Sequence, residues 1–309
     1  MTSRIEEAMR RLQASSGGAG GGIPRYLTRH TATHHEYLGL AIETDIAAFQ
    51  RHGFLPSSDA EMHRLAEEYR SIKRRLLPAA DPARAALPLG NLVMVGSAVA
   101  NEGKTFACAN LALSIAREKD WSIVLVDADI KKRELTEFFS AEGELGVLDL
   151  IKEQELDFES VVMPTSMPGI SFLPAGGRDQ DASELLASER MRDLCLEISR
   201  RDSHRIVLFD SSPVLLTSEA SVLATQVGQI VLIVRANSTP QQAVLAALAQ
   251  LDHRKPMACV LNNVTAVLGA IDSYGQYGQY EYGNHALEAP LGGAGREGTF
   301  EERVRETRE

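Results

Sequence analysis

The chain is 309 residues long, carries 32 Lys and Arg against 42 Asp and Glu, and has a formal net charge of −10. Its 44% hydrophobic and 24% charged residues are ordinary for a globular protein and exclude a chain that is disordered throughout. The acidic balance argues against a general nucleic-acid binder, which would show a basic domain or a basic face. At roughly 100–200 residues per domain, the length allows one large domain or two modest ones.

No segment of the sequence is expected to cross a membrane or to direct secretion. The longest charge-free runs, 160–177 and 85–101, are broken by prolines and other non-helical residues, and no apolar run reaches the ~18 residues of a spanning helix. The N-terminus, residues 1–13, contains two glutamates and is not followed by the apolar stretch of a secretory signal. We therefore expect the protein to reside in the cytosol.

The cysteines do not suggest a disulfide or zinc framework. Cys108, Cys195 and Cys259 are far apart, odd in number and set in apolar contexts typical of helices or strands. We expect all three to be buried as small hydrophobic side chains.

Residues 1–22 are expected to form a short amphipathic helix followed by a flexible linker. Ile5, Met9 and Leu12 recur with helical spacing, and residues 14–22 are rich in Gly, Ser and Ala. Two interpretations stay open, a frayed terminus and a docking helix on a tether.

Residues 23–88 are expected to form a helical N-terminal region. Its last helix, at 60–77, is closed by Pro78 and Pro82, because proline disfavours the helical conformation at the residue before it. Three histidines of this region are expected to be solvated rather than bound to metal: His30, His34 and His35.

Residues 89–266 change to short apolar strands that alternate with helices. Five runs are expected to be strands: 92–95, 123–126, 206–209, 230–234 and 258–261. Three windows between them are expected to be helical: 104–117, 188–200 and 240–251. Apolar strands that alternate with helices indicate parallel βαβ units, so we predict an α/β fold with an open, doubly wound, mostly parallel sheet. Ligands of such sheets bind at the carboxyl ends of the strands, so the chemistry is expected just after the first three strands.

The loop after the first strand has the composition of a phosphate-binding loop. Gly96 to Thr105 reads Gly-Ser-Ala-Val-Ala-Asn-Glu-Gly-Lys-Thr and leads directly into a helix. Such a loop can wrap phosphates with backbone N–H groups, place Lys104 on them and offer the Thr105 hydroxyl to Mg²⁺. The standard pattern has glycine where Ala98 stands, and Asn101 is the most acceptable non-glycine residue where a loop needs positive φ. The strand before and the helix after disfavour the alternative, a chance Gly-Lys-Thr in a turn.

Carboxylates follow two further strands. Asp127 and Asp129 come directly after the strand at 123–126, and Asp210 after the strand at 206–209. Because the carboxyl ends of parallel strands share one edge of the sheet, these acids can converge on Mg²⁺ and the γ-phosphate. A single aspartate after a strand is usually a helix cap, but two such strands beside a phosphate loop favour a nucleotide site.

As a set, these motifs resemble the bacterial tyrosine kinases, P-loop autokinases that regulate capsule and exopolysaccharide export. The resemblance covers roughly residues 60–285 and rests on the Ser-Ala-x-x-x-Glu-Gly-Lys-Thr loop, the Asp-x-Asp and Asp-x-x-Pro motifs, and a tyrosine cluster near the C-terminus. It implies the deviant Walker architecture of P-loop NTPases, ATP and Mg²⁺ as cofactors, and phosphoryl transfer to tyrosine.

The resemblance also assigns roles to residues. Lys104 and Thr105 hold phosphate and Mg²⁺, and Asp210 is the Walker B acid that holds the Mg²⁺ water shell. Asp127 is a metal-shell or base residue acting on the incoming tyrosine hydroxyl, with Asp129 as its partner. The nucleotide-binding residues implied are Asn101, Glu102, Gly103, Lys104, Thr105 and Cys108, with Asn262 reading the adenine edge.

A second implied feature is an oligomerisation helix. Glu67, Arg70 and Lys73 resemble the Glu-x-x-Arg-x-x-Arg pattern through which such kinases assemble into homo-oligomeric rings, with lysine in the final place. The exchange of arginine for lysine loses bidentate geometry and weakens such a ring. A solvated charged face is the alternative, and both stay open.

The chain departs from the family pattern at several positions. Ala100 and Asn101 stand where the family has Pro-Gly, and Lys131 and Glu134 where arginine and then proline are common. A looser phosphate loop would slow turnover or make an activator more necessary. None of these changes removes a phosphate or metal ligand.

Residues 267–309 are expected to form a flexible tail that carries the phosphate acceptors. These are Tyr274, Tyr277, Tyr280 and Tyr282, separated by Gly, Gln and Glu. Each phosphate adds about −1.5 to −2 charges, so modification of an already acidic chain can drive subunits apart. The alternative is a low-complexity tail without a function.

The short N-terminal helix on a Gly-rich tether resembles the kinases found beside exosortase-linked exopolysaccharide clusters. That resemblance implies a separate kinase chain, activated and held at the inner face of the membrane by the cytoplasmic segment of a membrane-bound chain-length-determinant protein. A tyrosine phosphatase is implied as antagonist, and nucleic acid is not implied as a partner.

Two other functions stay open. A partitioning or division-site ATPase has the same broad fold, but it carries a signature lysine where Val99 stands and often ends in a basic or amphipathic segment. A pseudokinase scaffold would bind nucleotide and partner without phosphoryl transfer.

Overall fold

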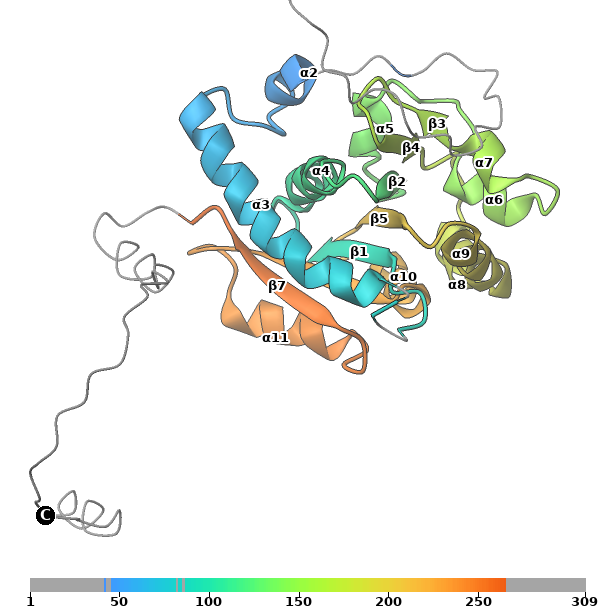
Figure 1. The fold of residues 1–309 in the computed structure, drawn as a ribbon. Coiled ribbons are helices and arrows are strands. Elements are labelled where there is room, and N and C mark those ends of the chain that lie inside the picture. The colour runs from blue at the N-terminus through green and yellow to red at the C-terminus, as the bar shows by residue number, and fades with distance from the viewer. Residues whose placement is uncertain (1–41, 43–45, 82, 85–86, 265–309) are drawn as a thin grey trace, which may run out of the picture. The chain divides into compact units, whose positions relative to one another are not determined.

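The computed structural model describes residues 42, 46–81, 83–84 and 87–264 (Figure 1). Three predicted features lie outside these residues: the N-terminal helix with its linker, the three histidines, and the tyrosine tail. They stay predictions, as do the domain bounds.

A seven-stranded sheet lies at the centre of the described part, in the order β3-β4-β2-β5-β1-β6-β7. The five predicted strands are present as β1 (Leu92–Ser97), β2 (Ser122–Ala128), β5 (Arg205–Ser211), β6 (Gln229–Arg235) and β7 (Met257–Asn262). All neighbours pair in parallel except β3 (Met163–Pro164) and β4 (Ile170–Leu173), which pair antiparallel. The predicted doubly wound, mostly parallel sheet is confirmed.

Strands β3 and β4 were not predicted from the sequence. They are two and four residues long and lie in a segment interrupted by Pro164, Pro168 and Pro174. Segments this short show no alternation of apolar and polar residues. Only the pairing of β3 with β4, and of β4 with β2, makes them strands.

Helices cover both faces of the sheet, each over its own buried cluster of apolar side chains. One face is covered by α2 (Ile46–Arg51), α3 (Asp59–Ala80), α4 (Lys104–Ile115) and α5 (Glu134–Phe138). The other is covered by α6 (Val147–Lys152), α7 (Phe158–Val161), α8 (Ala182–Ala187), α9 (Glu189–Arg201), α10 (Ser218–Gln226) and α11 (Gln241–Ala249). The predicted windows correspond to α4, α9 and α11. Helices α5 to α8 have too few turns to signal their period in the sequence, and α10, although as long as α11, was not predicted either.

Within the described residues, none of the helices combines the length and apolar character that a membrane crossing requires. The long helix α3, visible across the front of the sheet in Figure 1, carries charged residues from its first turn to Arg75.

Helix α3 continues to Ala80, past the end predicted at residue 77. The helix begins at the N-cap residue Ser58, whose hydroxyl accepts from the Glu61 N–H at 3.2 Å. Pro78 lies in the last turn, where it removes a single backbone hydrogen bond, and Leu76 and Ala80 around it are buried. Packing of this last turn outweighs the lost bond, so the expectation that Pro78 closes the helix is wrong.

Lys73 is an internal anchor of α3. Its Nζ donates to the Ser114 carbonyl at 3.0 Å and pairs with Glu118 at 2.5 Å, and the residue is 5% exposed. Ser114 lies in the last turn of α4, where carbonyls lack helical partners and a cation is favoured. Lys73 therefore fastens α3 to α4 within one chain, which corrects its place among the oligomerisation residues. Glu67 and Arg70 pair with each other at 2.6 Å on the exposed side of the helix.

The cysteines divide between core and surface. Cys108 and Cys195 are buried as predicted, but Cys259 is exposed. Cys259 lies on β7, which among the described strands pairs only with β6 and forms an edge of the sheet. The apolar context in the sequence does not reveal that this strand has a neighbour on one side alone.

Replacing Lys73 with methionine is expected to lower the free energy of unfolding by about 2 kcal/mol, because a buried charge-assisted hydrogen bond and an ion pair are lost. Urea unfolding followed by circular dichroism measures the change. Arg74→Met, on the exposed side of the same helix, is the matched control and should change stability by less than about 0.5 kcal/mol. Equal losses in the two variants would contradict the anchoring role.

Candidate active site

The phosphate loop joins β1 to α4 and turns through two left-handed residues. Asn101 has a φ of 64° and Gly103 a φ of 88°, so the prediction that Asn101 takes a positive φ is confirmed. A Cβ on Gly103 would lie 2.2 Å from Asn262 Nδ2, so the close approach and the positive φ together favour glycine there. Ala98, the departure from glycine, is fully buried and its methyl group packs in the core.

Glu102 braces the loop from inside. Its Oε2 accepts from the Val99 N–H at 2.7 Å, and its Oε1 accepts from the Arg235 N–H at 3.2 Å and from the Thr239 hydroxyl. The side chain is 2% exposed. Its carboxylate is therefore directed into the protein, and Glu102 can contribute only backbone to a nucleotide. The sequence offers no signal for its partners on the loop after β6.

Lys104 forms the centre of the site. Its Nζ lies 2.8 Å from Asp129 Oδ2 and 3.6 Å from Asp210 Oδ1, and it donates to Thr105 Oγ1 at 3.3 Å. Burial alone would lower the pKa of this lysine, but the carboxylates of Asp210 and Asp129 raise the pKa above its ordinary value. The ammonium group is therefore charged in the folded protein and positioned for an anion.

Asp127 is fully buried at the end of β2 and is held by a residue that the sequence analysis does not identify. Its Oδ2 accepts from both the backbone N–H and the hydroxyl of Thr136, each at 2.8 Å. Thr136 Oγ1 in turn accepts from the Ala175 N–H at 3.1 Å. Burial raises the pKa of Asp127, although the bonds from Thr136 oppose the rise. Thr136 belongs to no motif, and only the position of α5 against the end of β2 in the folded protein reveals its role.

Asp129 and Asp210 occupy different electrostatic states. Burial works against ionisation of Asp129, but Lys104 and a 2.9 Å hydrogen bond from Ser212 hold its pKa below the ordinary value. Asp210 is more deeply buried, and burial raises its pKa to about 7, with Asp127 reinforcing and Lys104 opposing the shift. Asp127 and Asp210 are register partners on neighbouring strands. The predicted convergence of the three acids on one edge of the sheet is present.

The donor set fits a magnesium ion that arrives with phosphate. Both carboxylate oxygens of Asp210 are buried and lack a hydrogen-bond donor at close range, although Thr105 and Lys104 lie nearby, as expected for groups that face a hydrated cation. Mg²⁺ usually keeps several waters and is bound through one or two carboxylates plus substrate phosphates. Among the residues that the structure describes, no three His, Cys, Asp or Glu side chains converge closely enough to hold a metal on their own.

Two residues of the predicted nucleotide set have contrasting places. Asn262, at the end of β7, donates from Nδ2 to the Glu102 carbonyl at 2.8 Å and so lies against the phosphate loop. Cys108 is fully buried in the core on α4, and burial raises the pKa of its thiol. Its side chain packs in the core, and its assignment to the nucleotide set stays a prediction.

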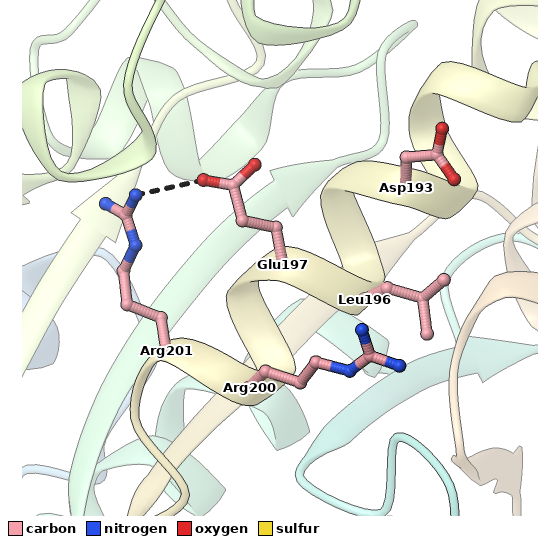
Figure 2. A pocket seen from close by; sticks show the side chains of 5 residues that line it. All are labelled: Asp193, Leu196, Glu197, Arg200 and Arg201. Carbon is pink, nitrogen blue, oxygen red and sulfur yellow. Dashed lines mark hydrogen bonds and ion pairs between the residues drawn. The ribbon is translucent and has the colours of Figure 1, made fainter.

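Two of the hollows on the described surface differ in where they lie, and one adjoins the site. It has a volume of about 440 Å³ and its lining includes Lys132, Arg133, Thr136, Gly176 and Arg178. The other, of about 530 Å³, lies on the outside of α9, where Arg201 pairs with Glu197 at 2.9 Å (Figure 2). Because α9 ends where β5 begins, the second hollow lies toward the amino ends of the strands, away from the phosphate loop.

The chain is similar to bacterial tyrosine kinases. It is 28% identical over 194 residues to the tyrosine-protein kinase wzc of Salmonella typhi, which is 62% of this chain and 26% of that protein. It is 27% identical over 188 residues to the tyrosine-protein kinase YwqD of Bacillus subtilis, 60% of this chain and 77% of that protein. The solved kinase domain of VpsO matches with 28% identity and a TM-score of 0.51, covering 64% of this chain and 100% of that domain. No protein-family model matches the chain.

The similarity covers unequal shares of these relatives. The chain spans about a quarter of the length of wzc but most of the length of YwqD. The fold is that of the VpsO kinase domain, a P-loop architecture with a mostly parallel sheet, as the resemblance implied.

Glu102→Gln is expected to weaken ATP binding about tenfold and to lower the free energy of unfolding by about 2 kcal/mol. All three partners of this carboxylate are donors, so an amide would set its NH₂ group against one of them. Titration with a fluorescent ATP analogue and urea unfolding measure the two effects. Glu155→Gln, at an exposed glutamate, is the control. Equal changes in ATP affinity and in the free energy of unfolding in the two variants would show that the Glu102 contacts have no role.

Asp210→Asn is expected to stabilise the nucleotide-free protein at pH 8 by on the order of 2 kcal/mol and to leave it unchanged near pH 4. The pKa of Asp210 rises from 3.8 to about 7 on folding, so its contribution to stability is present below pH 4 and is lost as the pH rises through 7. Asparagine cannot ionise, so the variant does not lose this stability as the pH rises. Thermal unfolding with EDTA at both pH values, beside the exposed Asp120→Asn, tests this. A gain of equal size at both pH values would contradict it.

Proposed function

Because the chain carries, by homology, a protein-tyrosine kinase domain of the bacterial type, we propose that it is an autokinase acting on its own C-terminal tyrosines. The acceptors are Tyr274, Tyr277, Tyr280 and Tyr282. The observation that supports this most directly is the convergence of Lys104 and three aspartates at one sheet edge beside a phosphate loop.

Nucleotide binding requires an exchange of partners at Lys104. In the described structure its ammonium group is held by Asp129 at 2.8 Å. Phosphates in the loop would draw Lys104 toward the transferred group, and Asp129 would then be released from its ion pair. When bound with the nucleotide, Mg²⁺ neutralises and orients the phosphates. Thr105 and Asp210 would hold it, the latter through water.

The transfer itself depends mainly on positioning and electrostatics. Asp127 is fixed by Thr136 and has a raised pKa, which suits a group that accepts a proton from the tyrosine hydroxyl. Asp129, once released, would share that role as its partner. Asn262 would present its remaining amide oxygen to the adenine edge, since its Nδ2 is engaged by Glu102.

The proposal extends to assembly and location. Glu67 and Arg70, on the exposed side of α3, would contribute to a homo-oligomeric ring in which the tail of one subunit reaches the site of the next. A membrane-bound chain-length-determinant protein would activate the kinase and hold it peripherally at the inner membrane, and a tyrosine phosphatase would oppose it. The pathway regulated would be exopolysaccharide or capsule polymerisation and export, in the exosortase-associated form.

Incubation with ATP and Mg²⁺ is expected to add phosphate to the four tail tyrosines in the wild type, and to none of them in Lys104→Met. Intact-mass and peptide mass spectrometry, with and without the cytoplasmic segment of the membrane partner, measure the modification. Lys119→Met, at an exposed lysine, should behave as wild type. If the protein binds or hydrolyses ATP but forms no phosphotyrosine under any condition, the autokinase proposal is wrong, and an ATPase switch or a scaffold remains.

A further inference from the structure

An acidic side chain that was not among the predicted site residues contacts the phosphate loop. Glu134 is the first residue of α5, and its Oε2 accepts from the Thr105 hydroxyl at 3.3 Å. Thr105 is 4% exposed, whereas Glu134 is accessible to solvent. Glu134 therefore lies at the open side of the site. It contacts the Thr105 hydroxyl, which would bind Mg²⁺ in the proposed function.

The polarity of this contact is determined by Lys104. An ammonium group can only donate, so the 3.3 Å contact from Lys104 Nζ occupies a lone pair of Thr105 Oγ1. The hydroxyl proton of Thr105 is then left for a carboxylate: Glu134 Oε2 lies 3.3 Å away, and a hydrogen bond from Thr105 also lowers the pKa of the buried Asp210. One lone pair of Thr105 remains for a cation, and no proton remains for a phosphate oxygen.

Glu134 is held in this place by a rigid element. Its neighbour Leu135 is fully buried, and Thr136 bonds Asp127. Phe138, at the end of α5, packs edge-on against Phe49 and Phe54 with ring centroids 4.9 and 5.0 Å apart. The helix is thus fastened at both ends, so the Glu134 backbone has little freedom to leave the loop.

Glu134 also adds to an excess of negative charge. Asp127, Asp129 and Asp210 already face a single lysine, and the charge of Glu134 is one of the influences that keep Lys104 protonated. A nucleotide that enters without a cation brings further negative charge to this edge. A cation bound between the phosphates and Thr105 would convert the repulsion by Glu134 into attraction.

We propose that Glu134 is a positioning residue that makes nucleotide binding depend on Mg²⁺: it orients the Thr105 hydroxyl for the cation and repels phosphates that arrive without one. This rests on the proposed nucleotide site but not on phosphoryl transfer. By linkage, the strength of the coupling is the ratio of the nucleotide Kd in EDTA to the Kd in Mg²⁺.

The test is titration of the full chain with a fluorescent ADP analogue, in EDTA and in saturating Mg²⁺. ADP carries no transferable γ-phosphate, so the result does not depend on kinase activity. Glu134→Gln is expected to reduce the coupling ratio about five- to tenfold, the range expected for one partly exposed carboxylate beside a cation. Most of the change should come from tighter binding in EDTA. Glu134→Asp should restore part of the ratio.

Glu137→Gln is the matched control, because Glu137 lies exposed on the same helix. Its coupling ratio should equal that of the wild type. A double variant with Thr105→Val should show no further loss from Glu134→Gln, since the two residues act as one unit. An unchanged ratio in Glu134→Gln, or an equal fall in Glu137→Gln, would overturn the proposal. Nucleotide binding that is absent in the wild type would instead count against the proposed nucleotide site.

Discussion

The ion pair between Lys104 and the aspartates at the carboxyl edge of the sheet is the interaction on which the site depends. A buried ammonium group is tolerated only with opposite charge nearby, and a cluster of buried carboxylates only with a cation. Lys104 meets Asp129 at 2.8 Å and Asp210 at 3.6 Å, and each group makes the burial of the others possible. The compensation is incomplete, because three buried carboxylates face one lysine. That remaining negative charge is what a metal ion with its phosphates would balance.

Side chains from distant segments hold this edge in shape. Glu102 ties the phosphate loop to the loop after β6, and Asn262 ties the same loop to the end of β7. Thr136 connects Asp127 to the segment that follows β4. Lys73 fastens α3 to the far end of α4, the helix whose first residue is Lys104. Movement of the loop would therefore require several buried polar contacts to break together, which favours a preorganised cradle.

Much of the site could be predicted from sequence because a parallel sheet converts order along the chain into proximity in space. The strands before Asp127 and Asp210 are apolar on both faces, so they had to be interior strands, and their carboxyl ends had to share an edge. Asn101 was predicted to turn the loop because few side chains tolerate a positive φ. The burial of Lys73 and the exposure of Cys259 were not predicted, since a spacing pattern does not say which face of an element is covered.

The sequence by itself determined the class of fold, the phosphate loop and the three aspartates, because these follow from local periodicity and from residues at fixed offsets after a strand. Only the tertiary structure decided the partners of those residues. Thr136, Glu134 and Arg235 were not among the predicted site residues, yet Thr136 bonds Asp127, Glu134 bonds Thr105 and Arg235 bonds Glu102. The physical reason is that hydrogen bonds and ion pairs between segments depend on how helices return to the sheet, and that path is set by packing of the whole core rather than by any one segment.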